Sequence, residues 1–185
     1  MLAIGAPLHA EHFIEMAQLE RRFYGDEYIT PAAEAFACYT RFPLSTVAAT
    51  AADGGVVGFV NLFPVRQHVF NGLLSGTFND SALTEADMAE VPPPHGERLP
   101  MFLSCIAIDP AYRAGGTARR LLCAAADGYA SVEHLCDLVV TDNVTEDGRR
   151  FSERLGFSFV CESDHGSRVY AMRYAELLQR LRRAR

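Results

Sequence analysis

The segment Ile106-Ala-Ile-Asp-Pro-Ala-Tyr-Arg-Ala-Gly-Gly-Thr-Ala-Arg-Arg-Leu-Leu122 joins an apolar stretch to a predicted helix through a proline turn and a glycine pair. A strand that runs into a helix in this way leaves the first helical N–H groups without intrahelical partners. Those N–H groups and the helix dipole favour an anion, and small residues let it approach the backbone closely. We therefore predict that the loop over residues 113–118 binds a phosphate or diphosphate.

Around this segment the hydrophobic pattern predicts two helices followed by a sheet. Residues 9–24 place apolar side chains mainly on one helical side, and Pro31 opens a second helix that extends to Tyr39. Two strands, 46–51 and 56–63, flank Asp53-Gly54-Gly55, which favours a tight hairpin turn. Further elements are expected as short helices near 69–74 and 84–88, strands at 101–108 and 135–141, helices at 117–130 and 147–155, and a strand pair at 157–161 and 168–174. The length and the 49% apolar content predict one domain over residues 1–185.

A second motif, Phe151-Ser-Glu-Arg-Leu-Gly-Phe157, follows the loop after one helix and one strand. In the loop itself, Arg113, Gly116 and Ala118 fit the spacing Arg/Gln-x-x-Gly-x-Gly/Ala. Together the two motifs resemble those of the GNAT N-acyltransferase superfamily, and the order of elements over residues 46–174 agrees with it. The resemblance implies an α/β (α+β) fold in which a mixed, mostly antiparallel sheet splays at the cofactor strand and is flanked by helices.

The same resemblance implies acetyl-CoA as co-substrate and no metal. Backbone N–H groups of the loop would hold the CoA diphosphate, and the preceding strand would pair with the pantetheine arm and leave the thioester near Ser104 and Cys105. An asparagine after the next strand would also contact the pantetheine. The implied cofactor-binding residues are Ile106, Ala107, Ile108, Arg113, Ala114, Gly115, Gly116, Thr117, Ala118 and Asn143.

Acyl transfer to an amine or hydroxyl needs a base, an oxyanion donor and an acid. Members of the superfamily often take the acid from a tyrosine four positions before the glycine of the second motif, and Ser152 stands there in this chain. A serine hydroxyl is far less acidic than a phenol, so we expect it to act on the CoA sulfur by hydrogen bonding or through water.

The general base is open. The positions that carry a glutamate in histone-type and ribosomal-protein relatives fall at Phe102 and near Val140, which accept no proton. His95 and Glu97, directly before the cofactor strand, are the local candidates, with an exposed loop pair as the alternative. Asp80 and His68 are further options in the segment over residues 65–99, which we expect to form the acceptor pocket.

Several functions are excluded or left open by composition. The net charge of −6 argues against a nucleic-acid binder, and no 18-residue apolar run or basic-then-apolar leader indicates a membrane or secreted protein. Five cysteines without a Cys-x-x-Cys pair favour reduced thiols in a cytoplasmic protein. The basic tail, residues 177–185, is expected to be a short exposed helix, and a homodimer is left open.

Three functions remain. The first is an N-acetyltransferase that acts by direct attack in a ternary complex on a small-molecule or peptide amine. The second is a non-catalytic acyl-CoA-binding or sensing domain. The third is an N-acyl amino acid type synthase that uses longer acyl chains.

Overall fold

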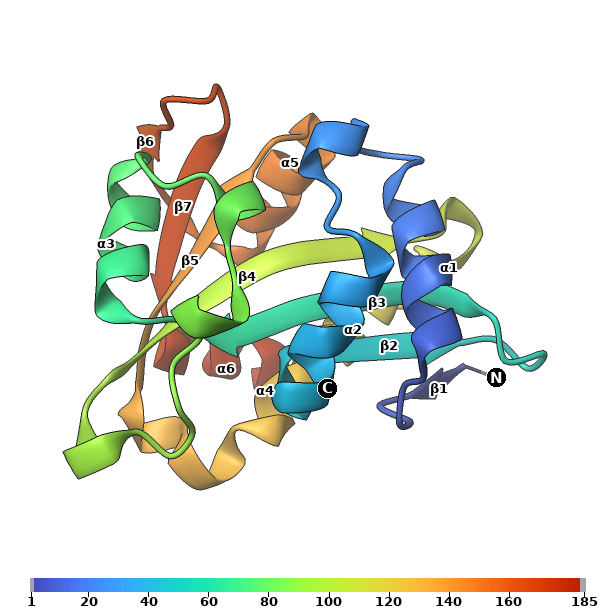
Figure 1. The fold of residues 1–185 in the computed structure, drawn as a ribbon, viewed down its shortest axis with the longest axis horizontal. Helices are drawn as coiled ribbons and strands as arrows, with labels where there is room; N and C mark the ends of the chain where they lie inside the picture. Colours follow the sequence, from blue (N-terminus) through green and yellow to red (C-terminus); the bar gives the residue numbers. More distant parts are fainter. Residues whose placement is uncertain (1, 184–185) are drawn as a thin grey trace. The chain divides into compact units, whose positions relative to one another are not determined.

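The computed structural model of the chain describes residues 2–183 (Figure 1). The described strands are hydrogen-bonded in the order β1-β2-β3-β4-β5-β7-β6. Their bounds are β1 Ala3–Ile4, β2 Thr46–Thr50, β3 Val56–Pro64, β4 Leu99–Ile108, β5 Cys136–Asn143, β6 Ser158–Glu162 and β7 Arg168–Arg173. The α-helices are α1 Ala10–Glu20, α2 Ala32–Arg41, α3 Gln67–Ser75, α4 Thr117–Gly128, α5 Glu146–Leu155 and α6 Tyr174–Arg183. The predicted mixed, mostly antiparallel sheet is confirmed.

Contacts divide the chain into two compact units. One comprises the chain up to Leu62 together with Cys105–Tyr129, and the other comprises Phe63–Ser104 together with the chain from Ala130 onward. Strand β4 therefore contributes its first six residues to the second unit and its last four to the first.

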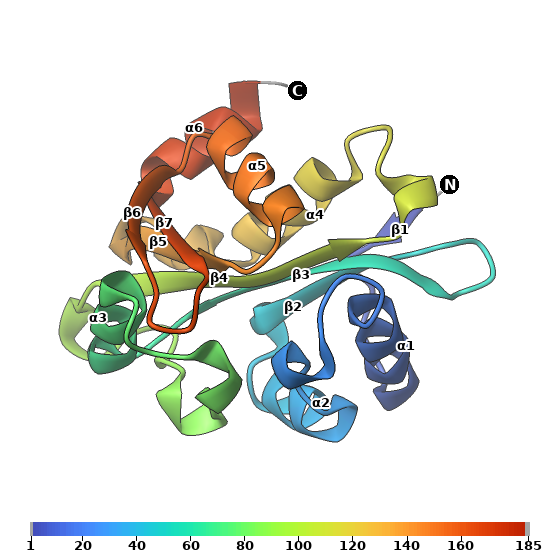
Figure 2. The same ribbon diagram turned by 90° about the horizontal axis from the view of Figure 1, so that it is seen from above.

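The first unit is built on the antiparallel strands β1, β2 and β3, with α1 and α2 on one face and α4 on the other (Figure 2). The predicted hairpin is present, since the Ala51 N–H donates to the Gly55 carbonyl at 2.9 Å and Gly54 has a φ of 92°. Apolar residues on one side of α1 fill the core, where the Phe13 ring packs against the rings of Phe36 and Tyr39 at centroid distances of 5.5 and 5.4 Å. The apolar residues of α1 recur at helical spacing, and the sequence predicted this buried side because the pattern is local.

In the second unit, β5 pairs with β7 and β7 with β6, all antiparallel. Helix α3 covers one face of these strands, and α5 and α6 cover the other (Figure 2). The first part of β4 runs parallel to β5, and the last residue pair between them is Phe102 with Val140. Pairing thus stops before β5 ends at Asn143, as predicted for a splayed parallel strand.

Two predictions about local structure are corrected. The predicted helix at residues 84–88 is a single 3-10 turn, η4 (Glu85–Asp87), one of three such turns in the segment 65–99. The predicted exposed tail helix is α6, which buries Tyr174, Leu177, Leu178 and Leu181 on one side, because their spacing forms an apolar stripe. Its arginines occupy the other side, and Arg185 lies outside the described residues.

Candidate functional site

The predicted anion loop enters α4 through two glycines in the left-handed conformation. Gly115 has a φ of 78° and Gly116, the N-cap, has φ 75° and ψ 24°. L-residues with a side chain rarely adopt these angles, which accounts for the glycine pair. A Cβ at either position would meet no atom within 4 Å, so the loop presents open backbone to solvent. The geometry matches an anion cradle at a helix N-terminus.

Contacts behind the loop fix its start. The Asp109 carboxylate accepts the Ala111 N–H at 2.9 Å and pairs with Arg22, and the Asp109 N–H donates to the Val57 carbonyl at 2.9 Å. The bond from Ala111 and the charge of Arg22 lower the pKa of Asp109. The turn is therefore held from the strand side, which leaves the glycine pair facing outward.

The side chain of Arg113 is directed at the protein itself. Its Nε donates to the Ile108 carbonyl at 3.2 Å, and its guanidinium lies 4.9 Å from the centroid of the Phe23 ring. A cation over an aromatic face in this range is attractive. Within the predicted cradle, Arg113 thus offers its backbone to a ligand and uses its side chain to anchor the loop.

The remaining predicted cofactor residues lie on β4 and β5. Ile106 is half-buried, whereas Ala107 and Ile108 are buried. Asn143, at the end of β5, holds Ser152 of α5 in the second unit: its Nδ2 donates to Ser152 Oγ at 3.0 Å, and that hydroxyl lies 3.3 Å from Asn143 Oδ1. Ser152 is 1% exposed. The structure brings these two predicted site residues together as a buried hydrogen-bonded pair.

His95 and Glu97 are not part of that hydrogen-bonded pair. Both are exposed, and His95 lies in the turn η5 (Pro94–Gly96) with a φ of 54°. Along an extended chain, Glu97 lies seven positions before Ser104, where the thioester is expected, a span of roughly 23 Å. Their predicted role as base stays a prediction.

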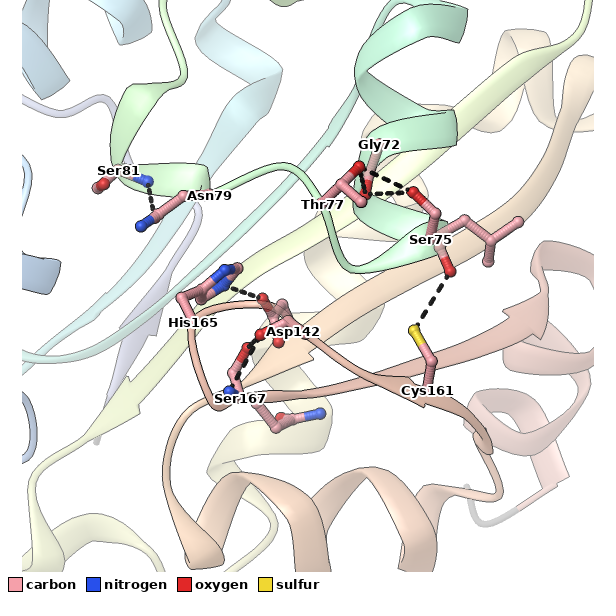
Figure 3. A network of polar contacts seen from close by, with 12 residues as sticks. Gly72, Ser75, Thr77, Asn79, Ser81, Asp142, Cys161, His165 and Ser167 are labelled. Carbon is pink, nitrogen blue, oxygen red and sulfur yellow. Dashed lines mark hydrogen bonds and ion pairs between the residues drawn. The ribbon is translucent and has the colours of Figure 1, made fainter.

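A cluster that the sequence did not reveal surrounds the end of β5 in the second unit (Figure 3). His165 Nε2 lies 2.9 Å from Asp142 Oδ2, and Asp142 Oδ1 is buried without a hydrogen-bond partner. Asp80, one of the further base options, belongs to it through η3 (Asp80–Ala82): burial first, and then the charge of Asp142, raises the pKa of Asp80 to about 6. An acidic residue directly after the predicted strand 135–141 was the available signal.

Two features are absent from the described residues. Within residues 2–183, no group of three or more His, Cys, Asp or Glu side chains is arranged to hold a metal ion. Among the described helices, none has both the length and the apolar character of a membrane span.

Comparison with known proteins gives a match in structure only. No family model matches the sequence, and no curated protein does. The loading GNATL domain of CurA from Lyngbya majuscula matches with a TM-score of 0.66 at 13% identity, over 95% of this chain and 98% of that one. The chain has the GNAT fold.

Other solved GNAT-fold structures agree over nearly the whole chain. The NatC complex bound to Gag peptide and CoA matches with a TM-score of 0.59 at 15% identity, over 92% of this chain and 95% of that one. The PaiA N-acetyltransferase from Thermoplasma acidophilum, in complex with coenzyme A, matches with a TM-score of 0.59 at 13% identity, over 94% and 99%. At such low identity, the likeness establishes the fold.

Proposed function

We propose that the protein is an acyltransferase that moves an acetyl group from acetyl-CoA to an amine in a ternary complex. The observation that carries the proposal is the left-handed Gly115–Gly116 pair at the start of α4, in the connection that follows β4. Its open backbone suits the diphosphate of CoA. Two of the structures with this fold, NatC and PaiA, are described with CoA bound.

The resemblance assigns the residues that would bind the rest of the acetyl-CoA donor. The strand Ile106–Ile108 would pair with the pantetheine, and the loop from Arg113 to Ala118 would hold the diphosphate with backbone N–H groups. Acetyl-CoA supplies the thioester that the acceptor attacks. NatC is described with a peptide and PaiA as an N-acetyltransferase, which supports an amine or peptide acceptor.

The test has two readouts. Calorimetry with CoA measures the donor site, and release of free CoA from acetyl-CoA, followed against a panel of amines, amino acids and peptides, measures transfer. We expect CoA to bind and raise the melting temperature, and at least one amine class to accelerate CoA release. Failure of CoA to bind at millimolar concentration would contradict the proposal.

A second candidate is a non-catalytic acyl-CoA sensor. It is favoured by the buried Ser152, which stands where many relatives carry an acidic tyrosine and which is hydrogen-bonded to Asn143. A sensor would bind CoA without turnover. Replacing acetyl-CoA by longer acyl-CoA donors in the same assay separates both from a synthase that uses longer chains.

A further inference from the structure

The Asp142 carboxylate at the end of β5 is buried and only half satisfied. Its side chain is 4% exposed, its Oδ2 lies 2.9 Å from His165 Nε2, and its Oδ1 makes no hydrogen bond. Burying a charged oxygen without a partner is unfavourable by several kcal/mol in general. A buried polar atom without a partner is uncommon in native structures and marks a candidate ligand site.

His165 is held in place by the turn between β6 and β7. Ser163 and Ser167 close the turn: their hydroxyl oxygens are 2.6 Å apart, and the Ser163 N–H donates to the Ser167 carbonyl at 3.0 Å. The turn is also tied to the end of α3, because the Asp164 N–H donates to the Gly76 carbonyl at 2.9 Å. Figure 3 shows His165 directed from this turn at Asp142. The imidazole is thus positioned before any ligand binds.

The cluster carries an excess of negative charge. Burial and the charge of Asp142 raise the pKa of Asp80, and His165 opposes that effect. The thiol of Cys161 also has a raised pKa, caused by burial first and then by Asp142 and Asp164. Two carboxylates thus face one imidazole, and when both are ionised the cluster is anionic whether or not the imidazole is protonated.

Several charged groups on the neighbouring elements are paired with other residues. On β7, Arg168 pairs with Glu162 and Arg173 with Asp137. On α3, His68 pairs with Asp87. Asp164 in the β6–β7 turn is exposed and adds a further negative charge. Asp142 interacts with His165, Asp80 and Cys161.

These features select an organic cation. A metal ion is disfavoured because the described side chains form no group of three or more suitable ligands. An ammonium group carries the positive charge and the N–H donors that an unpartnered carboxylate oxygen requires. We propose that Asp142, supported by His165 and Asp80, binds a primary ammonium group through Oδ1.

The register of the second unit relates this site to the proposed function, on which the identity of the ligand as acceptor rests. Phe102 of β4 pairs with Val140 of β5 in parallel. Pairing ends there, and Ser104 and Asp142 each lie two residues beyond it, on the same face of their own strand as Phe102 and Val140 because side chains alternate. Ser104 is where the resemblance places the thioester. On the proposed function, the bound ammonium is the acceptor amine, which attacks only after it has lost a proton, and the protein selects acceptors that are cationic at neutral pH.

The test is a titration of the isotope-labelled protein with n-butylamine, followed through the imidazole resonances of His165, alone and again with CoA added. We expect a saturable response to butylammonium and none to the neutral analogue 1-pentanol. Asp142→Asn should weaken butylammonium binding about tenfold to hundredfold, since it removes a charged hydrogen-bond acceptor. Asp164→Asn is the matched control, because it removes one negative charge from the turn that carries His165, and it should bind nearly as the wild type does.

If Asp142→Asn does not fold, Asp80→Asn serves as the second variant, with a smaller loss of affinity expected. The inference is overturned if the wild type shows no saturable response in either state, if 1-pentanol binds equally well, or if Asp142→Asn binds as tightly as the wild type. None of these results depends on acyl transfer. Loss of the proposed function would appear separately, as absent CoA binding or absent CoA release.

Discussion

Replacing Gly116 by aspartate tests the anion cradle. The residue has a φ of 75°, and a Cβ there meets no atom within 4 Å, so the substitution creates no clash. The left-handed backbone costs about 1–2 kcal/mol of stability for most side chains, and less for Asp or Asn. Two unit charges about 5 Å apart at an effective dielectric constant of roughly 20 to 80 repel by roughly 1–3 kcal/mol. That repulsion corresponds to roughly fivefold to hundredfold weaker CoA binding.

The assay is calorimetry with CoA, and two controls separate charge from backbone strain. Gly116→Asn has nearly the same shape without the charge and should lose much less affinity. Gly54→Asp places the same carboxylate at a φ of 92° in the β2–β3 turn, also without a close atom, and should leave CoA binding unchanged. The difference in CoA affinity between Gly116→Asp and Gly116→Asn should become smaller at high salt, because salt screens exposed charges. Equal CoA affinity in Gly116→Asp and wild type would refute the cradle.

Three further predictions concern the second unit. Gly76→Ala should destabilise the fold by about 2–4 kcal/mol in urea melts, because the φ of Gly76 is 74° and a Cβ would lie 2.8 Å from the backbone of the β6–β7 turn. Gly96→Ala is the control, with a φ of 71° and open space around the Cβ, and should lose less stability. The folded pKa of Asp80 is raised from 3.8 to about 6, so the wild type loses stability as pH rises from about 4 to above 6 and the carboxyl deprotonates. Asp80→Asn does not titrate and should therefore become more stable relative to the wild type over this range, as measured by thermal melts across pH. Ser152→Ala should lower stability by about 1–2 kcal/mol by leaving the Asn143 amide unpartnered and lower turnover only about tenfold; complete loss of activity in a folded variant would make Ser152 the acid.

The features that the sequence predicted correctly are local in the chain. The β2–β3 turn and the start of α4 need left-handed angles at Gly54 and Gly116, and glycine signals those angles directly. The apolar stripe of α6 was equally local. Its arginines indicated an exposed tail, although Leu177, Leu178 and Leu181 carried the spacing of a helix with one buried face.

The acidic cluster could not be predicted in the same way because its members come from distant segments. His165 meets Asp142 from 23 residues away, and Asp80 arrives on a 3-10 turn after α3. No motif spacing links a strand end, a hairpin turn and a loop before they fold. The sequence indicated only that Asp142 has a partner, since a carboxylate at the end of a buried strand is rarely left unpaired, and it did not indicate which residue that partner is.

The alternation of side chains along β5 places Asn143 and Asp142 on opposite faces of the sheet, and the two residues have different roles. Asn143 is paired across the strands with Arg168, and Asp142 with Val169, so the two side chains lie on opposite faces of the sheet. The resemblance singled out Asn143 and Ser152, and these two side chains form a closed hydrogen-bonded pair between β5 and α5. The neighbouring residue carries a charge that lacks its partner. Because a satisfied amide and hydroxyl gain little from a ligand while an unpartnered carboxylate gains much, the face of β5 that bears Asp142 is where an acceptor amine is expected to bind.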